Sequence, residues 1–309
     1  MHKIAHFIVQ SKAAAYIAAL LYIVMWSIQT VQAGGFSLSG CMSLLLTLGM
    51  GYFMMRMVRE FSLGDAKGAL PATFFFMSCA IAPVVSPLRG DGMHFILFFA
   101  ACYTLLRTYR RRNAMGSYFL AFVLVGIQCL LLPSCLLMLP LLVLCGAFME
   151  SLHVRTFFAA LWGLLFPYWV AGGVLFLTDR VGLIAPYFAQ VLPVMSDRLG
   201  MPQLLQLLWV LILVLPGGVA VLFNRTMRLQ TNAGYRLLLV ALVVLLVAVC
   251  LLPAHHSALL PCALLYSSVV GAALFTGNKH RAKNIYLIVL LLLWLFFLGQ
   301  PVWINYTMH

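Results

Sequence analysis

The stretch that decides the fold is MHFILFFAACYTLLRTYRRRNAMGSYFLAFVLVGIQCLL, residues 93–131. It consists of two apolar runs, of the kind that crosses a hydrocarbon core ~30 Å thick, on either side of one short basic segment. That segment holds Arg107 and the run Arg110 to Arg112. Because short cytoplasmic loops of membrane proteins carry an excess of Lys and Arg, the stretch predicts two membrane helices joined on the cytoplasmic side.

The same alternation of apolar runs and basic gaps continues outward to both ends of the chain. All but three of the 19 Lys and Arg residues fall in every second gap, and the exceptions are Arg89, Arg180 and Arg198. This pattern predicts an all-α, polytopic helical membrane protein with about eleven transmembrane helices, a cytoplasmic N-terminus and a periplasmic C-terminus. The expected spans are roughly 13–32, 38–56, 68–85, 93–108, 115–131, 134–150, 157–177, 203–223, 235–252, 257–275 and 284–303.

The composition excludes the common alternatives. The chain is 64% hydrophobic and 8% charged, whereas a soluble domain is about half apolar and about a quarter charged. No polar stretch is long enough for a separate soluble domain, so residues 1–309 are expected to form a single transmembrane domain. The net charge of +13 is divided among short loops rather than gathered on one face, which argues against nucleic acid as a partner.

Two parts of this topology have alternatives. The fifth and sixth spans meet at Leu132-Pro133-Ser134, and one long kinked helix would place Arg112 and Arg155 on opposite sides. The charges therefore favour two short helices. Residues 31–33 resemble a signal-peptide cleavage site, but the apolar run before them is long for a signal core, so we expect a retained helix.

The acidic residues suggest where a site would lie. Three of the six are expected on the outside, and each has an arginine within two residues: Asp91 with Arg89, Asp179 with Arg180, and Asp197 with Arg198. Two readings stay open. The pairs either balance one another at the interface, or they form an outer site in which arginine holds an anionic group and aspartate acts as a base or metal ligand.

The middle of the expected spans contains no Asp, Glu, Lys or Arg. Coupling to protons or sodium needs an ionisable group at membrane depth, which lowers the odds of an ion-driven pump. Gly172-Gly173 and Pro216-Gly217-Gly218 would either break their helices and expose backbone groups to a substrate or permit close helix packing.

Three outer features complete the candidate set. His255 and His256 lie in a tight turn, where they form either a polar turn or part of a site. The segment 178–202 is the longest loop, is expected to lie along the membrane surface, and would naturally cover a site. Cys129 and Cys135 flank Pro133 and would pair only on an oxidising side.

Several stretches together resemble an uncharacterised family of polytopic inner-membrane proteins of Bacteroidota, and the likeness covers most of the chain. It implies a bacterial inner-membrane location without implying an activity. The stretches that carry it are Arg59 to Leu63, Thr104 to Arg112, Pro167-Tyr168, Thr178 to Arg180, His255-His256 and Lys279 to Lys283.

Within residues 68–180 the parts follow a particular order. A helix ends in an outer loop with Asp91, a basic inner loop and two short helices follow, and another helix passes Pro167-Tyr168. This order resembles, more distantly, the middle of multi-spanning GT-C-type glycosyltransferases that use polyprenyl-phosphate sugars. Those enzymes carry a catalytic acid in the first outer loop, whereas residues 33–37 contain none. The resemblance implies a lipid-linked substrate and leaves catalysis open.

The leading expectation is therefore handling of a lipid-linked glycan or envelope precursor at the outer leaflet. The alternatives are a small-molecule or lipid transporter or flippase, and a non-catalytic subunit of an envelope complex. Membrane lipid, a polyprenyl-phosphate-linked substrate and envelope proteins are the expected partners, and no metal or cofactor is expected. The candidate catalytic residues are Asp91, Asp179 and His255, and the candidate substrate-binding residues are Arg89, Arg180 and His256.

Overall fold

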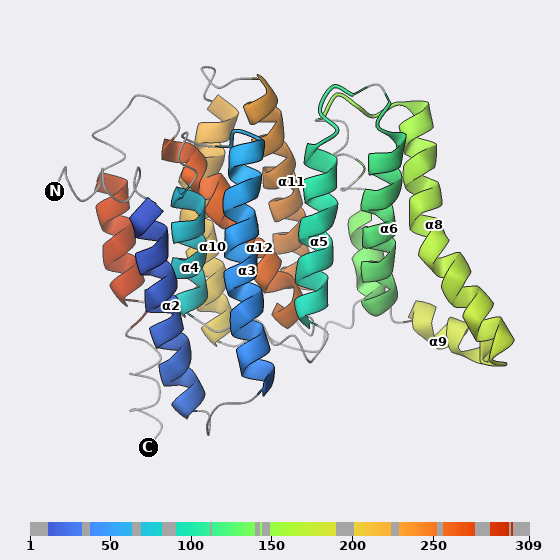
Figure 1. The fold of residues 1–309 in the computed structure, drawn as a ribbon, viewed down its shortest axis with the longest axis horizontal. Helices are drawn as coiled ribbons and strands as arrows, with labels where there is room; N and C mark the ends of the chain where they lie inside the picture. The colour runs from blue at the N-terminus through green and yellow to red at the C-terminus, as the bar shows by residue number, and fades with distance from the viewer. Residues whose placement is uncertain are drawn as a thin grey trace. The chain divides into compact units, whose positions relative to one another are not determined.

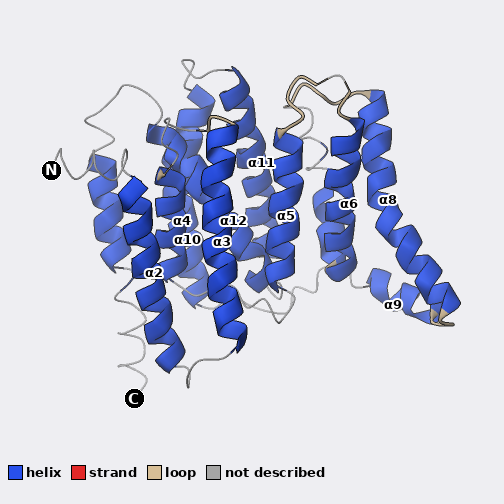
Figure 2. Ribbon diagram, viewed as in Figure 1, coloured by secondary structure: helices blue, strands red, loops and turns tan. Residues whose placement is uncertain are grey.

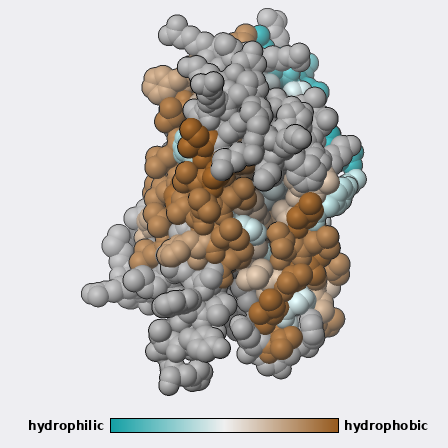
Figure 3. Space-filling view, turned by 90° about the vertical axis from the view of Figure 1, so that its left-hand side faces the viewer, coloured by the Kyte–Doolittle hydropathy of each residue, from teal (hydrophilic) through white to brown (hydrophobic). Residues whose placement is uncertain are grey.

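The computed structural model describes most of the chain. The described residues are 12–32, 38–63, 69–81, 91–111, 113–139, 143, 149–189, 201–223, 229–251, 256–275, 285–296 and 298. Within them all regular secondary structure is helical (Figure 2). Figure 3 shows apolar side chains over much of the described surface on the one face that it draws. A helical membrane protein is therefore confirmed at this coarse level.

The described helices follow the expected order along the chain (Figure 1). In the described part of the chain, four stretches are long and apolar enough to cross a membrane: Gly40–Glu60, Val154–Leu177, Gln206–Phe223 and Leu229–Cys250. Six shorter apolar helices accompany them in the described residues, among them Ile285–Phe296. The elements are α2 (Lys12–Gln32), α3 (Leu38–Glu60), α4 (Leu70–Ile81), α5 (Asp91–Leu106), α6 (Met115–Leu131), η2 (Pro133–Met138), α8 (Val154–Leu177), η3 (Val181–Leu183), α9 (Ile184–Ala189), α10 (Met201–Phe223), α11 (Leu229–Leu251), α12 (His256–Ala272) and η5 (Ala273–Phe275).

α3 and α11 extend furthest beyond the expected spans. α3 continues to Glu60, and α11 begins at Leu229. Arg56, Arg59 and Arg236 therefore lie on helices rather than in loops, and all three are exposed. Arginine tolerates such positions because its long apolar stem packs on the helix while the guanidinium reaches water.

The chain divides into two compact units, each built from separate stretches. The first comprises Met1–Val84, Leu205–Arg228 and Ser267–His309, and the second comprises Val85–Leu204 and Leu229–Tyr266. A single transmembrane domain over residues 1–309 stays a prediction, and the units are described separately below.

In the first unit α4 is the central element, because all of its residues are buried. α2 and α3 pack against it. The ring of Phe76 stacks on Tyr22, with ring centroids 6.3 Å apart, and occupies the space that a side chain at Gly51 would need. The indole N–H groups of Trp209 and Trp294 donate to Ser78 Oγ and Met77 O, each at 2.8 Å.

In the same unit, α10 crosses closely the last part of α12, from Ser267 onward. A Cβ on Gly217 would lie less than 3.0 Å from the Val270 carbonyl oxygen, and one on Gly271 would lie 3.1 Å from the Leu213 carbonyl oxygen. α10 continues as a helix through Pro216. Gly217 therefore serves helix packing, and the alternative of a broken helix at this position is wrong. α8 likewise continues through Gly172 and Gly173.

The second unit contains α5, α6 and α8, and α6 packs against both of the others. A Cβ on Gly126 of α6 would lie 2.9 Å from the Leu164 carbonyl oxygen, and one on Gly163 of α8 would meet the Phe119 carbonyl oxygen. Each helix thus contributes one glycine to the crossing. Small residues at such crossings let two backbones approach closely in a membrane.

The expected break after the fifth span is present. α6 ends at Leu131, Leu132 is extended, and Pro133 begins the 3-10 turn η2. Residues 140–142 and 144–148 of the sixth expected span, 134–150, lie outside the described residues, so its crossing of the membrane stays a prediction.

Candidate functional site at the α8–α9 turn

The structure describes two of the six candidate side chains, Asp179 and Arg180, which are adjacent and exposed at the end of α8. Asp91 is the first residue of α5 and His256 the first of α12. The side chains of these two residues lie outside the described part, as do Arg89 and His255 entirely. Convergence of the candidates on one site stays a prediction.

α8 is an apolar helix with one narrow buried face. Its buried residues, Thr156, Ala160, Gly163 and Pro167, recur at helical spacing and face α6. Only 17% of the apolar stretch of this helix is buried inside the molecule. The rest of the helix surface is therefore left to lipid or to another protein.

The end of α8 is a Schellman turn. The Arg180 N–H donates to Leu175 O at 2.9 Å, and the Asp179 N–H donates to Phe176 O at 3.3 Å. This pattern needs a residue in the left-handed conformation at the position of Asp179, whose φ is 56°. Aspartate tolerates that conformation better than most residues other than glycine, so the turn alone accounts for an aspartate here.

The turn places charge beside exposed apolar surface. Arg180 follows the carbonyl end of α8, where the helix dipole favours a cation. Exposed apolar side chains precede and follow it: Phe176, Leu177, Val181, Ile184 and Phe188. Chemically, this arrangement offers one cation to an anionic group and an adjoining surface to an apolar chain.

α9 is held to α6 through Tyr187. The Tyr187 hydroxyl donates to Cys129 O at 2.7 Å. The Tyr168 hydroxyl lies 3.2 Å from the Tyr187 hydroxyl. In an uninterrupted helix the N–H of residue 133 would donate to Cys129 O, but Pro133 has no N–H. Tyr187 therefore supplies the missing donor and fixes the segment that follows the Asp179 turn.

Sequence reasoning missed this role of Tyr187, although Pro133 marked the carbonyl that would need a partner. Burial raises the pKa of the Tyr187 hydroxyl, so this group stays a protonated donor at neutral pH. Within the segment 178–202, the Tyr187 hydrogen bond holds α9 (Ile184–Ala189) against the end of α6. That the segment covers a site stays a prediction.

No metal centre or disulfide is present among the described residues. They contain no group of three or more His, Cys, Asp or Glu side chains that could hold a metal ion. Cys129 and Cys135 are free and buried.

The model of a family of unknown function (DUF6427) matches residues 6–304. The chain therefore belongs to this family. No curated protein matches the chain, and neither does any solved structure.

Proposed function

We propose that this member of the DUF6427 family handles a lipid-linked glycan or another envelope precursor at the outer leaflet of the bacterial inner membrane. The observation that carries the proposal is the juxtaposition at the end of α8. There the exposed charges of Asp179 and Arg180 lie next to the exposed apolar residues Leu177 and Val181.

This juxtaposition matches the two halves of such a substrate. A polyprenyl-phosphate lipid has a phosphate, for which arginine provides charge-assisted hydrogen bonds, and a long apolar tail that remains in the membrane. The exposed face of α8 provides an apolar surface for that tail, and Arg180 lies just beyond the end of this helix. The backbone hydrogen bonds of the turn join Arg180 to the end of α8, so head group and tail would be held in a fixed relation.

The proposal assigns roles to the other candidates. Asp91, Asp179 and His255 would act as bases, and Arg89, Arg180 and His256 would hold phosphate. At least two of Asp91, Asp179, Arg180 and His255 would then line one cavity beneath the segment 178–202. A separation above about 15 Å between these side chains, well beyond a Debye length of ~8 Å, would end the single-site idea.

Photocrosslinking tests binding. Vesicles that contain the full chain are labelled with a photoactivatable polyprenyl-phosphate probe, and the labelled peptides are identified by mass spectrometry. Arg180→Gln is expected to reduce labelling of α8 and α9 about tenfold, because a hydrogen bond to a charged group is lost. Arg59→Gln, which removes an exposed arginine from α3, is the matched control. Equal labelling of the Arg180→Gln variant and the wild type would contradict the proposal.

Two substitutions at Asp179 separate chemistry from turn geometry. Asp179→Gly keeps the left-handed conformation without strain, and Asp179→Asn keeps both the conformation and the side-chain size. If the carboxylate is a base, both variants lose turnover of the lipid-linked precursor and retain crosslinking. Full turnover in both variants would restrict Asp179 to its role in the turn.

The second candidate is a non-catalytic subunit of an envelope complex, and the exposed face of α8 favours it. This face carries Trp162 and Trp169, which are 68% and 77% exposed. A partner helix in the membrane would cover such a face. Loss of a co-purifying envelope protein in a Trp162→Ala, Trp169→Ala double variant, with unchanged probe labelling, would favour this candidate.

A further inference from the structure

The end of α6 and α8 remote from the Asp179 turn carries a second built surface. Two short segments meet there: residues 107–114, which join α5 to α6, and residues 149–153, which precede α8. The Arg110 N–H donates to Met149 O at 3.0 Å. This backbone contact fixes the two segments side by side.

A buried polar network holds the two segments together. The Ser151 hydroxyl donates to Thr108 Oγ1 at 3.1 Å and lies 2.9 Å from the Tyr118 hydroxyl. Thr156 Oγ1 in turn donates to Ser151 O at 3.0 Å. All four side chains are buried. A buried network of this kind makes its surroundings rigid, so the exposed residues next to it are held in place.

Glu150, the acidic residue of this region, forms an ion pair with Arg110. Arg110 Nε lies 2.7 Å from Glu150 Oε2, and both residues adopt left-handed backbone conformations, with φ of 54° and 52°. An ion pair exposed on the surface contributes little to stability. Its effect here is to neutralise Glu150, the carboxylate in the segment 149–153.

Other arginines of the region keep their charge. Arg111 and Arg155 are exposed, and neither forms an ion pair within the described part of the chain. Arg107 lies over the ring of Tyr103, 4.8 Å from its centroid. The surface is therefore cationic, and Arg111 and Arg155 are the exposed positive charges that a ligand could reach.

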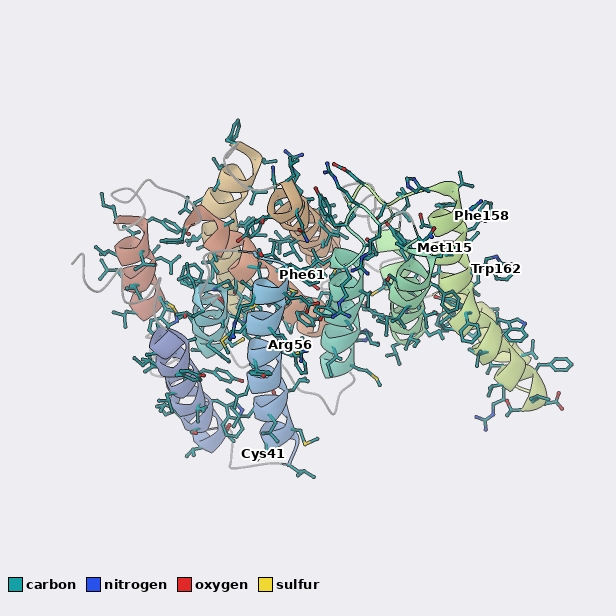
Figure 4. The ribbon with its side chains drawn as sticks, turned by 45° about the horizontal axis from the view of Figure 1, so that its top comes forward. Cys41, Arg56, Phe61, Met115, Phe158 and Trp162 are labelled. Carbon is teal, nitrogen blue, oxygen red and sulfur yellow. The ribbon has the colours of Figure 1, made fainter. Side chains whose placement is uncertain are left out.

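An apolar aromatic surface begins beside these charges. Phe158 and Trp162 of α8 are 52% and 68% exposed, and Met115 of α6 is 42% exposed. Figure 4 shows these three side chains on the neighbouring helices α6 and α8, with Phe158 and Trp162 on the outer side of α8. Gly163 lies on the face of α8 that meets the Phe119 backbone of α6, and this crossing holds α8 with Phe158 and Trp162 exposed.

We propose that Arg111, Arg155, Phe158 and Trp162 form a binding surface for one anionic phospholipid. The arginines would hold the phosphate, and the aromatic face of α8 would hold an acyl chain. Basic residues beside an aromatic rim suit the negatively charged cytoplasmic leaflet, which is the side on which the expected topology places Arg111.

Native mass spectrometry of the full chain tests this surface. The protein is released from detergent in the presence of phosphatidylglycerol or of phosphatidylcholine, and retained lipid is counted. Wild type is expected to retain one phosphatidylglycerol in preference to phosphatidylcholine. Arg111→Gln with Arg155→Gln is expected to lower that retention about tenfold or more, since each basic residue near a membrane surface attracts anionic lipid. The paired Lys substitutions should preserve it.

The matched control removes the same charge elsewhere. Arg56→Gln with Arg59→Gln changes two exposed arginines of α3 and should leave the preference intact. Equal loss in this control would mean a general charge effect and would overturn the proposal, as would unchanged retention in the Arg111 and Arg155 double variant. If that double variant does not fold, Trp162→Ala decides: reduced retention of phosphatidylglycerol supports the site, and unchanged retention overturns it.

Discussion

Two tyrosines replace hydrogen-bond donors that prolines remove. A proline at position i leaves the carbonyl of residue i−4 without its helical partner. Pro133 does this to Cys129, and Pro216 does it to Ile212. The hydroxyls of Tyr187 and Tyr286 donate to these two carbonyls at 2.7 Å and 2.8 Å. In each case a side chain from a distant segment supplies the hydrogen bond that the proline cannot donate.

This arrangement predicts a coupling between Tyr286 and Pro216. Tyr286→Phe should lower the free energy of unfolding by about 1–3 kcal/mol, because Ile212 O loses its donor in a low-dielectric setting. In a Pro216→Ala background the restored N–H takes over the carbonyl, so the same substitution should cost much less. Unfolding in mixed micelles, followed by circular dichroism, measures all four members of the cycle.

The control for this cycle is Tyr16→Phe, because Tyr16 is 63% exposed and its loss of a hydroxyl should have little effect. An equal cost of Tyr286→Phe in both backgrounds would show that the hydroxyl does not substitute for the missing donor.

At the scale of elements, the glycine crossings determine which helices pair. Gly163→Val should destabilise the protein by about 1–3 kcal/mol, because the added side chain must push the α6 backbone away. Gly172 lies on the same helix with nothing within 4 Å of its would-be Cβ. Gly172→Ala should therefore be neutral or stabilise by up to about 1 kcal/mol through helix propensity.

The two substitutions thus differ in direction although they lie on one helix. Thermal unfolding in detergent, monitored for both variants under the same conditions, makes the comparison. A similar loss of stability at both positions would mean that α8 does not pack on α6 through Gly163.

At the scale of the whole molecule, hydropathy located the helices well. The apolar runs predicted α2, α6, α8 and α10 within a few residues of their observed ends, and Pro133 marked the end of α6. Local sequence is sufficient for this, because each run must satisfy its own backbone in lipid.

The long-range contacts at the candidate site and within the first unit were not predictable in this way. The bond from Tyr187 to Cys129 joins residues 58 apart, and that from Tyr286 to Ile212 joins residues 74 apart. A single sequence shows which carbonyl lacks a donor but not which distant hydroxyl will reach it. The role of Asp179 was also ambiguous, because one residue type suits both a base and a left-handed turn.

The distribution of Lys and Arg predicts the orientation of the chain in the membrane. Single cysteines at positions 91, 180 and 255, introduced into a chain without its native cysteines, should react with a thiol reagent that cannot cross the membrane. Cysteines at 111, 228 and 280 should react only after the membrane is permeabilised, because the basic gaps hold these positions in the cytoplasm. Permeabilised cells labelled at all six positions give the control for accessibility. The reverse pattern at even two positions would overturn the orientation, and with it the assignment of Arg180 to the outer leaflet and of Arg111 to the inner one.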